Sequence, residues 1–346
     1  MKAKAGLLAA VVALCLVGLA VLPAAEDKPQ GEKLEVAKLK ITGPHTHDNL
    51  TIFVLHGPDR VKGEKFLTLK EALAAKKIVI HETGNVQRLV IENVGDVTVY
   101  IQSGEIIKGG RQDRMLQYDH IVPAQSGKQP ISSFCVESGR WSGRGGESAA
   151  VFQLSNNAAI GNAMKLAAKS EGDQSKVWKE VARAQDKLAS SYYVGGSVRA
   201  TTSPSSLQLS LEDKKLKEAA AAYQKELVKA LEGKGDAIGF AVAVNGKLST
   251  VDVYASNALL VKLWPKLLEA SVIEAIAEVK EGQKFTPATA EDVRKFVAEV
   301  EKAKATEKQI SKDVRMMMRE TDGAASFETR GQKDQLIHTG YHSKQN

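Results

Sequence analysis

Cysteine is scarce in this 346-residue chain and occurs only as Cys15 and Cys135. We expect Cys15 to be removed with an N-terminal signal segment, which leaves Cys135 alone and excludes an intramolecular disulfide in the mature chain. A lone cysteine in an oxidising compartment is either buried and inert or reactive. Free cysteine is among the most buried residue types, so burial is the first expectation for Cys135.

The sequence also lacks the short motifs that identify enzyme classes. It has no serine-hydrolase elbow, Walker motif, dinucleotide fingerprint or zinc-protease motif. Basic clusters are missing too, because most lysines lie among glutamates as on solvated helix faces, and we therefore expect no nucleic-acid partner. His45 and His47 are spaced to share a metal on a strand, but no further ligand motif stands nearby. An ordinary polar loop is the simpler interpretation, and we predict no metal and no cofactor.

The N-terminal residues have the composition of a secretory signal peptide. Lys2 and Lys4 precede an uncharged run at 5–22 and small residues near position 25. We expect cleavage and export to a periplasmic or extracellular location, with an uncleaved membrane anchor as the alternative. Residues 26–38 are polar and are interpreted as a linker. Because 1–25 carry two lysines and no acid, their removal lowers the net charge from +7 to +5.

Residues 39–155 have the pattern of an antiparallel β unit. Alternating apolar residues predict strands near 39–41 and 50–54. Three later runs of β-branched residues, separated by turn dipeptides, predict further strands at 78–81, 88–92 and 97–101. Thr68 and Glu71 predict a capping box that opens a short helix between the strands.

Residues 156–346 change to helical periodicity combined with hairpins. Apolar stripes predict helices at 156–168, 174–189, 211–231, 257–279 and 290–303. Asn245-Gly246 predicts a hairpin, because a type I′ turn needs positive φ at both residues. Trp264-Pro265 predicts a kink or helix junction, and a closing hairpin is expected between 326 and 342. We predict an α+β fold for 39–346, in one compact body whose two halves can share a sheet.

The densest polar cluster is GEIIKGGRQDR at 104–114, between two predicted strands. Gly109-Gly110 indicates a sharp bend, since glycine adopts positive φ without steric cost. Backbone N–H groups at such a bend can form a nest for an anion, and Arg111 or Arg114 can clamp phosphate or carboxylate bidentately. A second cluster, FCVESGRW at 134–141, follows a later strand.

These motifs, with TLKEAL, the GFAVAVNGKLSTVDVYAS hairpin and KLWPKLL, together resemble the ARG- and rhodanese-phosphatase-superfamily-associated (ARPP) domain family. The resemblance runs from about residue 39 to residue 342 and is specific because the motifs occur in combination. The family name records genomic association with ADP-ribose- and phosphate-processing enzymes, which implies a link to nucleotide-derived metabolites. The domain has no established activity, so the resemblance implies a fold rather than a reaction.

Two interpretations of the motif pair remain open. In the first, it binds a ligand through Glu105, Lys108, Gly109, Gly110, Arg111, Gln112, Asp113, Arg114, Glu137, Arg140 and Trp141. In the second, its arginines and carboxylates pair with each other and form a structural network that needs no ligand. A pocket with converging groups would favour the first, and buried paired charges the second.

The sequence accordingly supports two function classes. The first is an exported binding or sensing module for an anionic small molecule or a partner's acidic segment. The second is an enzyme that acts on a phosphate-containing or ADP-ribose-derived substrate, with Cys135, Glu137 or Asp113 as catalytic candidates. Glu137 would raise the pKa of the neighbouring thiol, and His120 is the nearest histidine in sequence that can serve as a base. The oligomeric state is not predicted.

Overall fold

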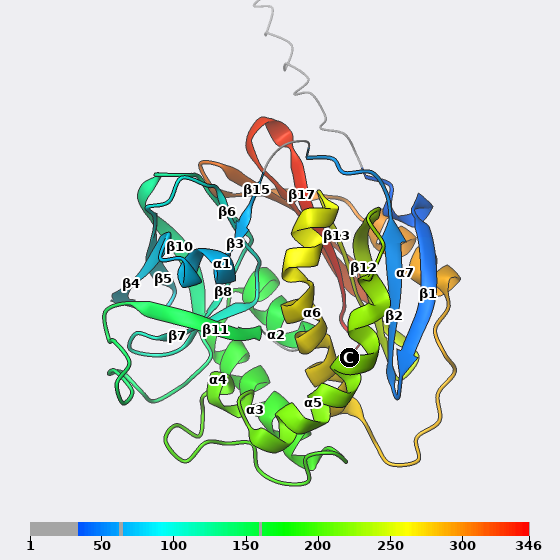
Figure 1. Ribbon diagram of the computed structural model, residues 1–346, viewed down its shortest axis with the longest axis horizontal. Helices are drawn as coiled ribbons and strands as arrows, with labels where there is room; N and C mark the ends of the chain where they lie inside the picture. The colour runs from blue at the N-terminus through cyan, green and yellow to red at the C-terminus, as the bar shows by residue number, and fades with distance from the viewer. Residues whose placement is uncertain (1–33, 62–64, 159–160, 346) are drawn as a thin grey trace, which may run out of the picture.

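The computed structural model describes residues 34–61, 65–158 and 161–345. The predicted signal segment at 1–25 lies outside these residues, so export stays a prediction. The described chain combines antiparallel sheets with helices and confirms the predicted α+β class (Figure 1). Among the described helices, none combines the length and apolar character that a bilayer crossing requires.

The largest sheet contains strands from both halves of the chain. Its order is β1 (Lys40–His47), β2 (Leu50–His56), β12 (Ala237–Val244), β13 (Lys247–Tyr254), β17 (Leu336–Ser343), β16 (Ala324–Arg330), β15 (Val314–Glu320) and β14 (Thr306–Ser311). The halves share the sheet because β2 pairs with β12. Asn245 and Gly246 turn between β12 and β13 with φ of 50° and 76°, as the predicted type I′ turn requires.

Helices cover both faces of this sheet. α6 (Asn257–Glu278) packs on one face and α7 (Ala290–Glu301) on the other (Figure 1). Side chains of β12 alternate between the two cores: Phe240 packs with the α6 side and Ala241 with the α7 side. This explains why β12 is buried along its whole length.

α6 is the central helix of the molecule. α3 (Gln174–Ser190) and α5 (Lys214–Leu227) pack against it. Of the two alternatives predicted at Trp264-Pro265, the helix junction is wrong, because α6 continues through Pro265, and the kink stays a prediction. Pro265 is exposed, and so is Val261 one turn earlier. The proline, which cannot donate to the Val261 carbonyl, thus lies on the exposed side of α6.

A six-stranded sheet and a three-stranded sheet share a further hydrophobic core. The former has the order β11 (Phe152–Ala158), β7 (Glu105–Gly109), β8 (Arg114–Leu116), β10 (Gly127–Cys135), β5 (Arg88–Asn93) and β4 (Ile78–Asn85). The latter consists of β3 (Leu67–Thr68), β6 (Val99–Ile101) and β9 (His120–Val122). α1 (Leu69–Ala74) follows β3 and begins with the predicted capping box of Thr68 and Glu71.

Two stretches differ from the sequence prediction. The helix expected at 156–168 begins later, because β11 pairs with β7 as far as Ala158. α2 covers Asn162–Leu166, and a π-helical turn continues it over Ala167–Glu171. The hairpin of β14 and β15 was not predicted, since its charged residues and three consecutive methionines show no alternation. The short helix α4 covers Leu207–Ser210.

Candidate functional site

The RQDR motif forms the turn between β7 and β8. Gly109 and Gly110 have φ of 101° and 57°, and a Cβ on Gly110 would lie 2.4 Å from the ring of Phe152. The bend therefore requires glycine, as the sequence predicted. The backbone N–H of Gly109 donates to Asp113 Oδ1 at 3.1 Å. A carboxylate of the motif thus takes the position in which we expected an external anion.

Asp113 is fully buried and has its hydrogen bonds satisfied by residues far away in the sequence. Arg144 donates to both of its oxygens, from Nη1 at 2.9 Å and from Nη2 at 3.2 Å. Ser206 Oγ donates to Oδ2 at 2.9 Å. Such a bidentate, charge-assisted contact is among the stronger hydrogen-bonding arrangements in proteins.

Glu137 forms the second half of the same buried network. Arg140 donates to its carboxylate from Nε at 2.8 Å and from Nη2 at 2.7 Å. Ser203 Oγ donates at 2.5 Å and the backbone N–H of Asp113 at 3.0 Å. The RQDR and CVESGRW motifs therefore meet through Asp113 and Glu137, which joins the turn after β7 to the segment after β10.

The two arginines of RQDR have different environments. Arg114 is fully buried, with Nη2 3.1 Å from Glu82 Oε2 and Nη1 donating to the carbonyl of Gln112 at 2.7 Å. Arg111 is exposed, and its guanidinium lies 5.4 Å from the ring centroid of Trp141, itself 43% exposed. Among Arg111, Arg114, Arg140 and Arg144, Arg111 alone is an exposed residue.

The remaining predicted residues lie outside the network or at its edge. Lys108 is half-buried on β7 opposite Gln153. Glu105 lies at the other end of β7 and contacts α6 instead. Sequence reasoning missed Arg144, Ser203, Ser206 and Glu82, which reach the network from distant segments and carry no local motif.

Burial opposes ionisation of both network carboxylates, but the outcomes differ. Burial raises the pKa of Asp113, and the nearby charge of Glu137 adds to this, although Arg144 and Ser206 lower it. For Glu137, burial also acts upward, yet hydrogen bonds from Arg140, Ser203 and the Asp113 backbone bring its pKa below the ordinary value. The arrangement resembles a closed structural network of paired charges more than a set of groups waiting for a ligand.

Cys135 ends β10 as a buried thiol. Burial raises its pKa to about 11, and the nearby charges of Glu82 and Glu137 add to the effect while Arg114 opposes it. The thiolate is the reactive form of cysteine. We therefore expect Cys135 of the folded protein to resist alkylation by iodoacetamide at pH 8 and to react after unfolding in urea, as followed by intact mass. Rapid modification of the folded protein would contradict the assignment of an inert thiol.

A separate site lies between α6, α1 and α5, which we call the lysine cleft. It has a volume of about 250 Å³, and its charged lining consists of four lysines and three glutamates: Lys70, Lys217, Lys262, Lys266, Glu105, Glu212 and Glu269. Lys266 Nζ lies 2.6 Å from Glu105 Oε1. Lys262 Nζ lies 3.2 Å from Glu71 Oε1 and donates to the Phe66 carbonyl at 2.7 Å. Within the part of the chain that the structure describes, Lys70 and Lys217 form no ion pair.

Sequence reasoning found only Glu105 of this cleft. The lysines were interpreted as solvated helix faces, and nothing in their local pattern distinguishes them from such faces. One usable signal exists: Lys262 and Lys266 are four positions apart on a predicted helix and must share a face.

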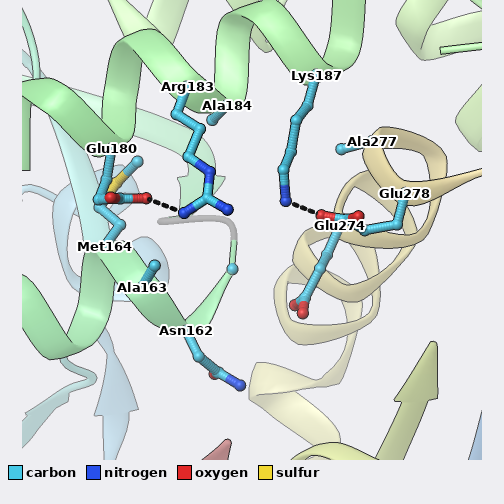
Figure 2. Close-up of a pocket in the computed structure, with 11 residues that line it drawn as sticks. Asn162, Ala163, Met164, Glu180, Arg183, Ala184, Lys187, Glu274, Ala277 and Glu278 are labelled. Atoms are coloured by element: carbon cyan, nitrogen blue, oxygen red, sulfur yellow. Dashed lines mark hydrogen bonds and ion pairs between the residues drawn. The ribbon is translucent and has the colours of Figure 1, made fainter. Parts of the chain in front are cut away.

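A third hollow at the other end of α6 is lined from α2, α3 and α6 (Figure 2). Arg183 and Lys187 point towards it, but both already meet carboxylates. Arg183 Nη1 lies 3.7 Å from Glu180 Oε2, and Lys187 pairs with Glu278. With a volume of about 50 Å³, this hollow offers less room and fewer free cations than the lysine cleft.

The buried imidazole of His338 bridges two buried carboxylates, those of Asp119 and Asp252. His338 Nδ1 lies 2.7 Å from Asp119 Oδ2, and Nε2 lies 2.9 Å from Asp252 Oδ1. Both ring nitrogens therefore face acceptors, which is the pattern of a protonated imidazole. The ring also stacks on Tyr254 with centroids 4.6 Å apart.

The histidine pair His45 and His47 shows no metal-binding arrangement. His45 Nε2 lies 3.1 Å from Lys234 Nζ, and the ring of His47 packs edge-on against Tyr223. Among the described residues, no group of three or more histidine, cysteine, aspartate or glutamate side chains is placed to hold a metal ion.

Comparison with known proteins gives one match. The family model of the ARG and Rhodanese-Phosphatase-superfamily-associated Protein domain matches residues 38–342. None of the curated proteins and none of the solved structures matches the chain. The matched range contains the RQDR network, the lysine cleft and the His338 bridge.

Proposed function

The chain belongs to the ARG and Rhodanese-Phosphatase-superfamily-associated Protein domain family, and within it we propose that this protein is a binding module for an anionic small molecule, which it holds in the lysine cleft. The observation that carries the proposal is that Lys70 and Lys217 line the cleft with no ion-pair partner among the described residues. Ammonium groups that converge on one concave site favour an anion there, because their potentials add.

Glu269 supports the same assignment. Burial raises the pKa of its carboxyl, against the opposing charges of Lys217, Lys266 and Lys70. An entering phosphate or carboxylate adds negative charge and so favours the protonated form of Glu269 further. Protonation of Glu269 on binding would remove the repulsion between its carboxylate and the anion, and the lysines would provide the charge.

The sequence suggested instead that the anion binds at the RQDR and CVESGRW motifs. We prefer the lysine cleft because Arg114, Arg140 and Arg144 already meet carboxylates. Displacing a buried carboxylate from its arginine costs as much as a new anion gains. The motif that extends from β7 to RQDR still contributes Glu105, whose ion pair with Lys266 forms a wall of the cleft.

A matched pair of lysine variants on α5 tests the site. Lys217→Ala should weaken the binding of inorganic phosphate or ADP-ribose about five- to tenfold, near 1–1.4 kcal/mol, as measured by calorimetry. Lys215→Ala removes the same charge from an exposed position of α5 that does not line the cleft, and should leave affinity within about twofold. Both lysines are exposed, so neither change should disturb the fold.

Arg111→Ala separates the two possible locations. The lysine-cleft proposal expects this variant to bind like the wild type, since Arg111 is exposed beside Trp141 and does not line the cleft. Loss of binding in Arg111→Ala together with full binding in Lys217→Ala would place the ligand at the motif and overturn the proposed location. Absence of any thermal shift would remove the binding function, because a ligand at 100 times its Kd should stabilise the fold by about 2.7 kcal/mol.

A further inference from the structure

The lysine cleft adjoins a second, more enclosed space behind the Lys266–Glu105 ion pair, which we call the deep compartment. Glu105, Leu263 and Lys266 line both spaces, so the two are adjacent and the ion pair lies at their boundary. The deep compartment has a volume of about 30 Å³. This is room for roughly two water-sized groups, given about 10–15 Å³ of such volume for one.

Asp252 presents an oxygen to this compartment. The residue is 2% exposed and lines the space, and its Oδ1 meets His338 Nε2 at 2.9 Å. Within the described residues no hydrogen bond reaches Asp252 Oδ2. Because Asp252 lines the compartment, a donor that enters the space meets a carboxylate acceptor.

Gln102 provides the complementary group. Its Oε1 accepts from the hydroxyl of Tyr254 at 2.9 Å, which fixes the orientation of the amide. The amide Nε2 has no partner within the described part of the chain, and the residue lines the same compartment. Lys165 lines the space as a further donor, so within the described residues the compartment offers Asp252 as acceptor and Gln102 and Lys165 as donors. A hydroxyl group can donate to the carboxylate and accept from the amide at the same time.

A hydroxyl fits this pair better than an ammonium does. An ammonium donates to Asp252 but cannot accept from Gln102. His338 and Lys165 also supply positive charge close to Asp252 already. A second cation would gain little from the carboxylate and would be repelled by Lys165.

Building on the proposed anion site, we infer that the ligand is a short phosphate ester of a polyol. Its phosphate lies among the lysines of the cleft, and a terminal hydroxyl passes the Lys266–Glu105 pair into the deep compartment. There the hydroxyl donates to Asp252 Oδ2 and accepts from Gln102 Nε2. The lysine cleft thus selects charge, and the deep compartment selects the hydroxylated end of the molecule.

Three probes and two matched variants test this inference by calorimetry. The probes are glycerol 3-phosphate, propyl phosphate and inorganic phosphate. Propyl phosphate has the same carbon chain as glycerol 3-phosphate but lacks its hydroxyl groups. Ala270→Phe fills the deep compartment, which Ala270 lines without lining the lysine cleft. Ala277→Phe is the control, because Ala277 is also half-buried on α6 but lines the hollow of Figure 2 instead.

Wild type and Ala277→Phe should bind glycerol 3-phosphate about tenfold or more tightly than propyl phosphate. Ala270→Phe should reduce glycerol 3-phosphate to the affinity of inorganic phosphate and leave inorganic phosphate unchanged. The inference is overturned if wild type shows no preference for the hydroxylated ester, or if the preference survives in Ala270→Phe. The wild-type comparison decides the matter even if Ala270→Phe does not fold. Phosphate binding without a preference would refute this inference alone, whereas no phosphate binding would refute the anion site itself.

Discussion

Replacing Glu137 by alanine should lower the free energy of unfolding by about 3–5 kcal/mol, the usual cost of removing one partner from a buried ion pair. Glu137 is fully buried and accepts hydrogen bonds from Arg140, Ser203 and the backbone of Asp113. Its removal leaves the Arg140 guanidinium, whose side chain is 11% exposed, without its main carboxylate partner. The loss is large because the arginine cannot release its charge.

Glu147→Ala is the matched control for this experiment. Glu147 also pairs with an arginine of the network, Arg144 at 3.0 Å, but its side chain is 19% exposed and Arg144 keeps Asp113. We expect a loss of about 1 kcal/mol or less, measured like the first by urea denaturation monitored through tryptophan fluorescence. If Glu137→Ala lowers the free energy of unfolding no more than Glu147→Ala does, the network does not stabilise the fold. The motifs should then be tested as a ligand site.

The sequence was sufficient to predict the parts of this network that rest on local chemistry. Gly109-Gly110 predicted the bend, because no other residue fits against Phe152 at that φ. The sequence also placed both motifs beside predicted strands, and in the structure they meet, since Asp113 N donates to Glu137 Oε2 at 3.0 Å. What the motifs contact outside themselves was not predictable. Ser206 binds Asp113 from 93 positions away, through a loop with no periodicity.

The lysine cleft could not be predicted from the sequence, for a related reason. Lys70, Lys217 and Lys266 belong to three different helices that only the tertiary fold brings together. On each helix alone, such a lysine has the pattern of an ordinary solvated face. A lysine becomes part of a site through what faces it across the cleft, and a single sequence does not contain that information.

The bridge of Asp119, His338 and Asp252 leads to the second large expected effect, a loss of stability on going from pH 7 to pH 9.5. Burial lowers the pKa of His338, but the two carboxylates outweigh it and raise the pKa from 6.5 to about 9. The folded protein thus holds a proton that the unfolded chain releases near pH 6.5. This contribution is complete below pH 6.5 and disappears as the pH rises through 9.

The other buried titratable groups near His338 change the stability of the fold with pH in different directions. Despite burial, His338 keeps the pKa of Asp119 and of Asp252 below the ordinary value, so their contribution is present above about pH 4 and is lost in acid. Burial lowers the pKa of His342, which costs stability only below pH 6.5. Burial likewise lowers the pKa of Lys169, and this opposes the His338 effect at the alkaline end. The pH dependence of the free energy of unfolding of the wild type therefore combines several contributions, and variants are needed to isolate that of His338.

The variant His338→Gln isolates the contribution of His338 protonation to stability, because glutamine keeps a hydrogen-bonding amide but does not titrate. The variant should be less stable than wild type at pH 7, and the gap should shrink by about 2–3 kcal/mol by pH 9.5, at 1.36 kcal/mol per pKa unit. His120→Gln is the control: burial lowers the pKa of His120 to about 4, so it is neutral across this range and its gap should stay constant. A gap for His338→Gln that is equally constant would mean that the imidazole between Asp119 and Asp252 is neutral. In that case one of the two carboxylates carries the proton that the geometry assigns to the histidine.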